Sequence, residues 1–355
     1  MGDKIRIWLI LTAVLILGGC TTNPQQISNS TANVAPVKYP PTPNLVSRIA
    51  FGSCNKYDLP QPLWQPIVNT KPDLWIWLGD IVYASNTDIS TMQRMYEKQK
   101  ENPGYRLLLQ TATVIGIWDD HDYGKNNGGK EYLYKEESQQ QLLNFLDEPL
   151  NSPRRKQKGV YAAYTYGQPG KQVKVFLLDT RYHREEPGSD RDILGEEQWA
   201  WLEKELGNSK AQVNLIASGI QIIPEEHPYE KWANFPKARR RLFDLIAKTK
   251  VPGVIFLSGD RHFAEISKIQ ATPVGYPLYE VTASGLTHSW EKLAQEANRY
   301  RLGNFFKFLH FGMLEIDWSS QPVRLKLQIR DRAGKVQLQQ TIPLSELQPD
   351  TRKKG

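Results

Sequence analysis

The chain has 355 residues, a formal net charge of +7 and 40% hydrophobic residues. This composition excludes an intrinsically disordered protein, because it supplies enough apolar surface to bury a core. The basic residues are scattered apart from one run at Lys237, Arg239, Arg240 and Arg241, which is typical of the solvated face of a helix. Nucleic-acid binding would need a concentrated basic stripe with interleaved aromatics, so we expect no nucleic-acid partner. A mild positive field suits an anionic substrate or a membrane surface.

Residues 1–20 have the pattern of a secretory signal. The segment begins with Lys4 and Arg6, continues with an apolar run over residues 7–17 and ends at Gly18-Gly19-Cys20. The apolar run is too short to span a bilayer as a mature helix. Small residues before a cysteine resemble the lipobox of bacterial lipoproteins, which implies cleavage before Cys20 and its lipidation. The alternative is an ordinary signal peptide that happens to contain a cysteine.

The remaining chain divides into three segments. Residues 21–44 are rich in Thr, Asn, Ser, Gln and Pro and predict a flexible tether. Residues 45–345 contain no internal repeat and no second linker, so we expect one domain, followed by a frayed tail over residues 346–355. If Cys20 is lipidated, Cys54 has no intramolecular disulfide partner. A lone thiol in an oxidising compartment is then either buried and inert or a metal ligand.

Short apolar runs within this domain end in polar or acidic residues, a pattern typical of central strands covered on both faces. These runs span residues 49–51, 74–78, 114–118, 173–178, 213–217 and 254–257. Helix-like spacing separates them at residues 89–100, 132–145, 196–206 and 237–248. The alternation predicts a largely parallel sheet. Residues 279–283, 311–317, 323–329 and 336–340 predict successive antiparallel strands. We therefore expect a pair of sheets flanked by helices.

Ionisable groups follow five of the predicted strands. In α/β sheets, ligands gather beyond the carboxyl ends of the strands, so these groups form a candidate site. A single acidic residue there could merely cap a helix, but convergence of several strand ends favours a site. The groups are Cys54, Asp80, Asp119, Asp120, His121, Asp179, Asp260 and His262.

Three motifs carry the expected chemistry. In Gly79-Asp80-Ile81-Val82-Tyr83, the carboxylate could bridge two cations and the phenolate is a hard ligand, although a helix cap and a core tyrosine remain the alternative. In Trp118-Asp119-Asp120-His121-Asp122, four successive ionisable groups could be buried only with cations or protons to compensate them. In Gly259-Asp260-Arg261-His262, the acid and the imidazole could reach one metal pair.

Together with Phe51-Gly52-Ser53-Cys54, these motifs resemble the PhoD-like alkaline phosphatase D family of calcineurin-like metallophosphoesterases, over about residues 47 to 318. The resemblance implies a four-layer α/β/β/α sandwich with two central mixed sheets and a site at the sheet edge. It implies two or more metal ions, iron and calcium, while the donor types also admit zinc or manganese. The residues that match the family's ligands are Cys54, Asp80, Tyr83, Asp120, Asp260 and His262, with Asp119 as a possible replacement for Asp120. His121 matches the family's invariant histidine.

The expected reaction is hydrolysis of phosphate monoesters or diesters by metal-bound hydroxide, outside the cytoplasm. His121 would protonate the leaving alkoxide or orient the substrate. The candidate substrate-binding residues are Arg181, Arg184, Asn126 and Gln221, with Asn127 and His288 as further candidates. Arginine forks match phosphate oxygens, but salt bridges to Asp179, Glu185 or Glu186 are an equal alternative.

Two other functions remain open at this stage. One is a phosphodiesterase specific for lipid or cell-wall polymers, and the other is a non-catalytic metal-binding lipoprotein. We expect a protein anchored by lipid to a bacterial membrane, facing the periplasm or the cell exterior, and we favour a monomer.

Overall fold

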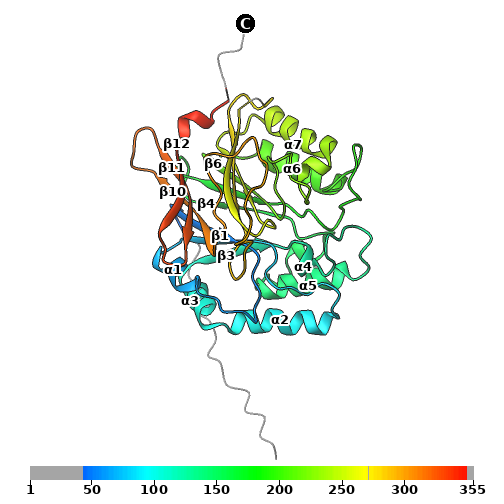
Figure 1. Cartoon of the computed structure of the whole chain (residues 1–355). Coiled ribbons are helices and arrows are strands. Elements are labelled where there is room, and N and C mark those ends of the chain that lie inside the picture. Colours follow the sequence, from blue (N-terminus) through cyan, green and yellow to red (C-terminus); the bar gives the residue numbers. More distant parts are fainter. Residues whose placement is uncertain (1–42, 271, 350–355) are drawn as a thin grey trace, which may run out of the picture. The chain divides into compact units, whose positions relative to one another are not determined.

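The computed structural model describes residues 43–270 and 272–349 (Figure 1). The predicted signal segment with Cys20, the tether up to residue 42 and the tail from residue 350 therefore lie outside the described residues. Among the helices of the described ranges, none is long and apolar enough to cross a bilayer.

The first sheet has six strands in the order β12-β11-β10-β1-β2-β3. Strands β1, β2 and β3 are parallel, whereas β10 runs antiparallel to β1 and continues into an antiparallel meander with β11 and β12. Their bounds are Arg48–Gly52 (β1), Leu74–Leu78 (β2), Thr113–Ile117 (β3), His310–Asp317 (β10), Arg324–Asp331 (β11) and Val336–Pro343 (β12).

The second sheet also has six strands, in the order β4-β5-β6-β7-β9-β8. The four central strands are parallel, and the two edge strands β4 and β8 are antiparallel to their neighbours. Their bounds are Ala162–Tyr166 (β4), Val173–Leu177 (β5), Val213–Ser218 (β6), Val254–Ser258 (β7), Ala264–Ile269 (β8) and Leu278–Ala283 (β9).

Helices cover the outer face of each sheet (Figure 1). The first sheet is covered by α1 (Trp64–Asn69), α2 (Ile89–Glu101), α3 (Pro103–Thr111), α4 (Asp120–Tyr123) and α5 (Lys135–Phe145). The second sheet is covered by α6 (Glu196–Gly207) and α7 (Pro236–Thr249). Short 3-10 turns complete the described chain at Pro153–Arg155 (η1), Trp232–Asn234 (η2) and Leu344–Leu347 (η3). The structure thus confirms the predicted α/β/β/α sandwich with two mixed sheets.

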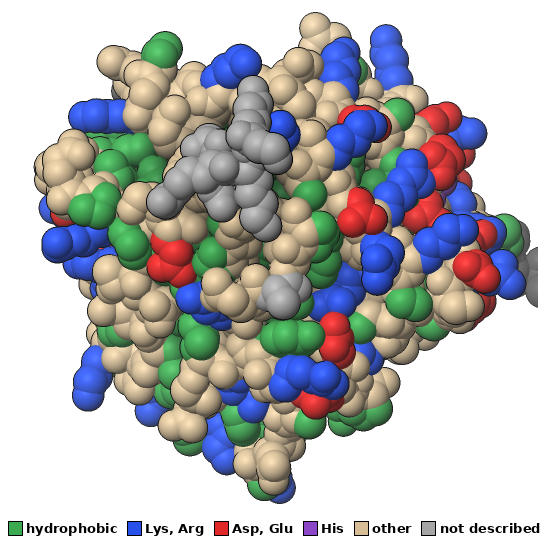
Figure 2. Space-filling model, turned by 90° about the horizontal axis from the view of Figure 1, so that it is seen from above, with side chains coloured by type: hydrophobic (Ala, Val, Ile, Leu, Met, Phe, Trp, Pro, Cys, Tyr) green, Lys and Arg blue, Asp and Glu red, His purple; other side chains and the backbone are tan. Residues whose placement is uncertain are grey.

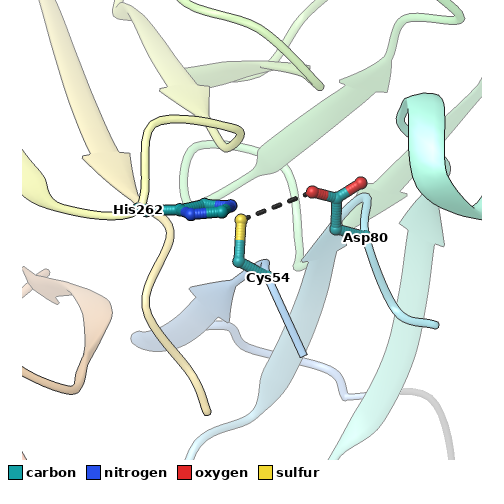
Figure 3. Close-up of side chains that lie close together, drawn as sticks. All are labelled: Cys54, Asp80 and His262. Carbon is teal, nitrogen blue, oxygen red and sulfur yellow. Dashed lines mark hydrogen bonds between the residues drawn. The ribbon is translucent and has the colours of Figure 1, made fainter. Parts of the chain in front are cut away.

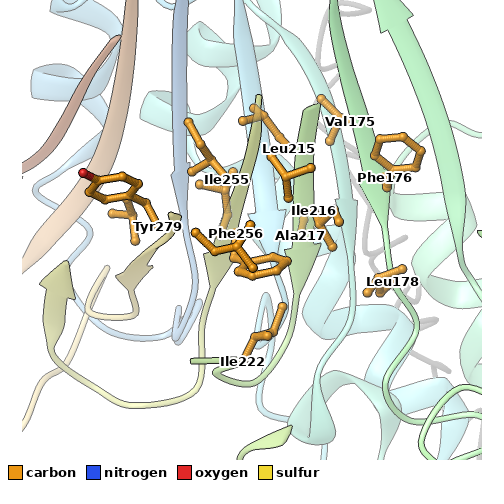
Figure 4. Close-up of a cluster of buried hydrophobic side chains, with 14 of the residues drawn as sticks. Val175, Phe176, Leu178, Leu215, Ile216, Ala217, Ile222, Ile255, Phe256 and Tyr279 are labelled. Carbon is orange, nitrogen blue, oxygen red and sulfur yellow. The ribbon is translucent and has the colours of Figure 1, made fainter. Parts of the chain in front are cut away.

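Alternation along β2 explains why this strand is apolar throughout. Trp75 and Trp77 pack on the helical side, while Leu74, Ile76 and Leu78 contribute to the core between the sheets. On the helical side, the Trp64 ring of α1 meets both tryptophans edge-on at centroid distances of 5.5 Å. In the second sheet, buried side chains of β5, β6 and β7 form a continuous apolar cluster (Figure 4).

One predicted strand lies in a different place from the one expected. Residues 279–283 belong to β9, which pairs in parallel with β7 in the second sheet and not with β10. The prediction of successive antiparallel strands is therefore right for β10, β11 and β12. It is wrong in placing residues 279–283 next to them, although this segment is a strand and is antiparallel to β8. Residues 284–309 connect β9 to β10 and carry the chain from one sheet to the other. The edge strands β4 and β8 were not predicted.

The basic run at the start of α7 is mostly a solvated face, as predicted. Lys237, Arg240 and Arg241 are exposed, and Arg241 pairs with Glu196 of α6 at 2.6 Å. Arg239 is half-buried and donates to the carbonyl of Ile222. On the face seen in Figure 2, Lys and Arg side chains are interspersed with Asp, Glu and polar side chains, without a continuous basic stripe.

Candidate metal centre

The candidate ligands come from the carboxyl ends of strands in both sheets. Cys54 follows β1, Asp80 follows β2, Asp120 begins α4 directly after β3, and Asp260 and His262 follow β7. Backbone hydrogen bonds tie these strand ends together, as in the donation from the Asn55 N–H to the Asp80 carbonyl at 2.8 Å. The topology therefore brings together residues more than 200 positions apart in the sequence, as the strand-end argument predicts.

The backbone at this point is unusual. Cys54, Asp80, Asp260 and His262 adopt left-handed conformations, with φ of 60°, 50°, 67° and 54°. Residues other than glycine rarely adopt this backbone conformation, because the Cβ makes it strained. Strained residues of this kind concentrate at functional sites. Four strained residues at one sheet edge favour a functional role for this turn cluster over helix capping.

Two glycines allow the close approach of these turns. Gly79 has a φ of +91°, and a Cβ at this position would lie 2.4 Å from the Cβ of Asp119. A Cβ at Gly259 would lie 2.7 Å from the carbonyl oxygen of Leu78. Each glycine directly precedes a candidate ligand, Asp80 or Asp260, so any larger residue would push the ligand-bearing turns apart.

The donor atoms form three overlapping groups. They are Cys54 with Asp80 and His262, Asp80 with Asp120 and His121, and Asp119 with Asp120 and Asp260. Within each group the donor atoms lie within 4.8 Å of one another, and Figure 3 shows the first group, with the Cys54 thiol 3.5 Å from Asp80 Oδ2. Asp80 and Asp120 each belong to two groups, which suits carboxylates that bridge neighbouring cations.

Tyr83 completes the first donor group. Its hydroxyl lies 3.4 Å from Asp80 Oδ2, 3.1 Å from His262 Nε2 and 2.8 Å from His288 Nε2. Burial, together with electrostatic coupling to His288 and His121, lowers the pKa of His262 to about 3. Both predicted ligands therefore face Asp80, and the imidazole is in the neutral form that binds metals.

The basic side chains of the protein do not fully compensate the negative charges of the buried carboxylates in the site. Burial, followed by the negative charges of Asp120 and Asp119, raises the pKa of Asp80 well above its usual value. Burial likewise raises the pKa of Asp260 to about 7. Asp119 Oδ2 and Asp120 Oδ1 are buried atoms without a hydrogen-bond partner. Unpartnered carboxylate oxygens within one cluster of acids fit a multivalent cation, whose charge would remove the repulsion.

Asp120 is the exception among these acids. Burial raises the pKa of its carboxyl, but the positive charges of Arg181 and His121 and a hydrogen bond from the Asn127 N–H lower it overall. Asp120 therefore stays ionised most readily. Asp119 is instead paired, because the Arg181 Nε donates to its Oδ1 at 2.7 Å. This pairing favours Asp120 over Asp119 as the more available ligand.

His121 is positioned at the edge of the cluster. Its Nδ1 hydrogen-bonds with the Ser85 hydroxyl at 2.9 Å, and its ring stacks on Tyr83 at a centroid distance of 4.0 Å. Burial lowers the pKa of its imidazole. One ring nitrogen lies close enough to Asp80 and Asp120 to share a cation with them, so the geometry allows His121 either role, ligand or catalyst.

A cavity of about 480 Å³ opens over this cluster. Asp120, His121, Asp260 and His262 form its floor. Its walls are lined by Asn126, Asn127, Arg184, Glu186, Pro187, Pro228, Tyr229, Glu230, Asn234, Arg261 and Trp290. The predicted substrate-binding residues Asn126 and Arg184 thus line the cavity.

The other two predicted substrate-binding residues lie behind the cavity wall. Arg181 is fully buried and donates from Nη2 to Glu230 Oε2 at 2.9 Å, in addition to its bond to Asp119. It therefore forms a salt bridge, but with partners other than the predicted Asp179, Glu185 or Glu186. Gln221 is also fully buried, and its amide nitrogen donates to Glu265 at 2.7 Å and to Thr282 at 2.8 Å. The structure does not bring Gln221 to the cavity.

Several residues of the site were missed by the sequence argument. Asp122 accepts the backbone N–H groups of Asp80, Ile81 and Asp119, at 3.2, 3.1 and 2.6 Å, and so fixes the turn that carries Asp80. The run of acids around Asp122 was a usable signal for this role. Glu230, which pairs with Arg181 and Arg184, gave none, because it lies in a segment without a recognisable motif.

The remaining histidines were expected on the surface or in the core. His310 is fully buried, accepts the N–H of Ser284 at 3.0 Å and hydrogen-bonds with the carbonyl of Phe308 at 2.7 Å. His227 is buried, and His183 is half-buried and bonded to the Lys158 carbonyl at 3.2 Å. These positions agree with the expectation.

Asp80→Asn should separate metal binding from folding. We expect metal affinity to fall by more than about tenfold, because the carboxylate shared by two of the donor groups is lost. Burial and the neighbouring carboxylates raise the pKa of the Asp80 carboxyl well above its usual value in the metal-free protein. This shift favours the neutral form, so an amide of the same shape should change the free energy of unfolding by less than about 0.5 kcal/mol. Asparagine also tolerates the left-handed backbone. Calorimetric metal titration and urea unfolding with a chelator measure both quantities. The control is Asp244→Asn, which changes an exposed carboxylate on α7. Strong destabilisation of metal-free Asp80→Asn would contradict the expectation that the Asp80 carboxyl matters for metal binding and not for folding.

Arg181→Met should destabilise the metal-free protein by on the order of 3 kcal/mol, because it leaves the buried Asp119 unpaired. Glu230 pairs with both Arg184 and Arg181, so it keeps one partner in Arg184→Met. The loss in the free energy of unfolding should therefore be clearly smaller for this variant than for Arg181→Met. Urea unfolding of both variants in the presence of a chelator gives the comparison. Equal losses would show that the Asp119–Arg181 pair is not the stronger constraint.

The family model described as PhoD-like phosphatase matches residues 49–327. Alkaline phosphatase D from Bacillus subtilis (strain 168) is 23% identical over 62% of this chain and 46% of its own length, so the chain spans about half of that relative. A solved structure of PhoD superposes with a TM-score of 0.67 at 18% identity, covering 87% of this chain and 70% of that one.

Two further solved structures share the fold. A dimetal phosphatase from Danio rerio gives a TM-score of 0.54 at 12% identity, covering 84% of this chain and 99% of that chain. The Plasmodium protein GAP50, described as the anchor in the inner membrane complex, gives 0.56 at 13% identity, covering 87% and 90%. Identities this low show the fold alone. The family match spans most of the domain and includes all of the candidate ligands, so the chain belongs to the PhoD-like phosphatase family.

Proposed function

We propose that this protein hydrolyses phosphate esters with the help of two or more bound metal ions. The observation that carries the proposal is the set of overlapping donor groups on the floor of a cavity with Arg184 in its wall. Membership of the PhoD-like phosphatase family and the fold shared with a dimetal phosphatase support it.

The donor types divide between two metal positions. Cys54, Tyr83 and His262 would supply a thiolate, a phenolate and an imidazole around Asp80 once a metal replaces the thiol and phenol protons, and this set suits ferric iron or zinc. Carboxylates dominate the other groups and suit calcium, magnesium or manganese. When bound, the metals would supply a nucleophilic water at neutral pH and charge to offset the phosphoryl oxygens. Iron and calcium are our first expectation from the family resemblance.

The protein's own groups would hold and protonate the substrate. Arg184 keeps a buried Nε without a partner, although its other nitrogens bond to Glu230 and to the Asn127 carbonyl. Arg184 lines the cavity, and a guanidinium there suits a phosphate oxygen. Because Ser85 engages His121 Nδ1, the opposite ring nitrogen is left to protonate a leaving alkoxide.

We further propose that the protein acts outside the cytoplasm, held to a membrane by lipid on Cys20. The support is the sequence pattern of residues 1–20, because this segment lies outside the described structure. Such an anchor would also favour substrates near a membrane, including lipid or cell-wall polymers.

The activity is tested by supplying purified protein with iron, calcium, zinc or manganese and measuring release of 4-nitrophenol from the phosphate monoester and the bis-ester. We expect turnover with at least one metal combination. His121→Gln should lower kcat by about 10²–10⁴ with unchanged metal content, because a general acid is lost. His183→Gln is the control, since this histidine lies outside the cavity lining.

The outcomes of this test separate the alternatives. Loss of metal in His121→Gln would make this residue a ligand and not a catalyst. A strong preference for the monoester would remove the polymer diesterase from consideration. No turnover with any of these metals would favour the non-catalytic metal-binding lipoprotein.

The anchor is tested on protein from membranes of a bacterial host that processes lipoproteins. We expect mass spectrometry to find a mature N-terminus at Cys20 carrying acyl chains, and Cys20→Ala to release the protein from the membrane. An unmodified Cys20 in the mature protein would refute the anchor.

A further inference from the structure

One wall of the cavity is aromatic and has no part in the chemistry proposed above. Tyr229 and Trp290 line it together with Pro228. The Tyr229 side chain is 46% exposed, although large apolar side chains are otherwise mostly buried in the described chain. The two rings meet edge-on at a centroid distance of 5.0 Å. An exposed tyrosine paired with a half-buried tryptophan beside a polar catalytic floor calls for a physical reason.

This aromatic wall is fixed rigidly to the candidate metal centre. The backbone N–H of Trp290 donates to the backbone carbonyl of His262 at 2.8 Å, and the centroids of their side-chain rings lie 5.7 Å apart. Arg261 lies between Asp260 and His262 in sequence and is buried. Its guanidinium lies 4.3 Å from the Tyr229 ring centroid and 5.0 Å from that of Trp290, and it also pairs with Glu296. These cation–π contacts hold both rings in place before any ligand arrives.

The rest of the cavity lining has a different chemical character. It carries Asn126, Asn127, Arg184 and Glu186. A phosphoryl group held at the floor would place its anionic oxygens toward Arg184 and the metals. The organic part of the ester would then extend away from the floor, where the ring faces and edges of Tyr229 and Trp290 also line the cavity.

We propose that Tyr229 and Trp290 form a leaving-group subsite that favours phosphate esters carrying a planar aromatic ring over esters of small polyols. The inference rests on the proposed phosphoesterase function. Stacking of a flat ring on Tyr or Trp is worth about 1–3 kcal/mol, or about 5-fold to 150-fold in affinity, and the preset rings reduce the entropy lost on binding. Glycerol and similar alcohols present no ring face and would gain little.

Binding can be measured without turnover by using phosphonates, which the enzyme cannot hydrolyse. We expect the metal-loaded protein to bind phenylphosphonate about tenfold more tightly than methylphosphonate in calorimetric titrations. Tyr229→Ala and Trp290→Ala should reduce this preference to about twofold or less, while leaving methylphosphonate affinity unchanged. Tyr229→Phe should retain the preference, because the ring remains.

The matched control is Tyr134→Ala, because Tyr134 is 56% exposed and does not line the cavity. Kinetics supply the second readout. Tyr229→Ala should raise KM for phenyl phosphate about tenfold, with little change in kcat, and should change KM for glycerol 2-phosphate by less than about twofold.

The two proposals fail in different ways. Equal effects of Tyr229→Ala on the phenyl and glycerol esters would overturn the subsite, as would equal affinity of the unaltered protein for both phosphonates. Absence of turnover on every ester would refute the phosphoesterase function, and the phosphonate preference would then decide whether the aromatic wall binds flat rings at all.

Discussion

Repulsion among buried carboxylates is the constraint on which the rest of this site depends. Asp80 lies fully buried beside Asp119, Asp120, Asp122 and Asp260, and all four raise the pKa of its carboxyl after burial itself has done so. The protein supplies guanidinium groups at the sides of the cluster, with Arg181 bonded to Asp119 and Arg261 4.0 Å from Asp260. The centre, around Asp80, is left to protons or to metal ions.

The fold imposes this concentration of charge through its turns. Asp122 accepts three backbone N–H groups and holds the turns after β2 and β3 against each other. Gly79 makes that contact possible, because any Cβ there would collide with Asp119. The strained backbone at Asp80 and Asp260 is stable only because the two covered sheets surround it. The apolar packing of the two sheets would therefore contribute to metal affinity, because it holds the donor residues in position before a metal binds.

Much of this arrangement could be predicted from sequence because its signals are local. Strands buried on both faces are continuous apolar runs, and the acids that follow them mark the sheet edge. The ion pairs of Arg181 could not be predicted from local sequence, because its partners Asp119 and Glu230 lie 62 and 49 positions away. Gln221 follows an apolar strand just as Asp80 does, but its side chain points to Glu265 and Thr282. The direction of a side chain after a strand depends on the turn and not on the strand pattern.

The same distinction separates the floor of the cavity from its walls. The floor of the cavity comes from the turns that follow strands of the two sheets. The walls come from segments outside strands and long helices, around Asn126, Arg184, Tyr229 and Trp290. Loops tolerate substitution better than covered strands do, so substrate preference can change while the metal donors stay fixed. Arg261 limits that freedom. It separates two candidate ligands in sequence and packs against both aromatic rings, so a change at this residue would disturb the donors and the wall together.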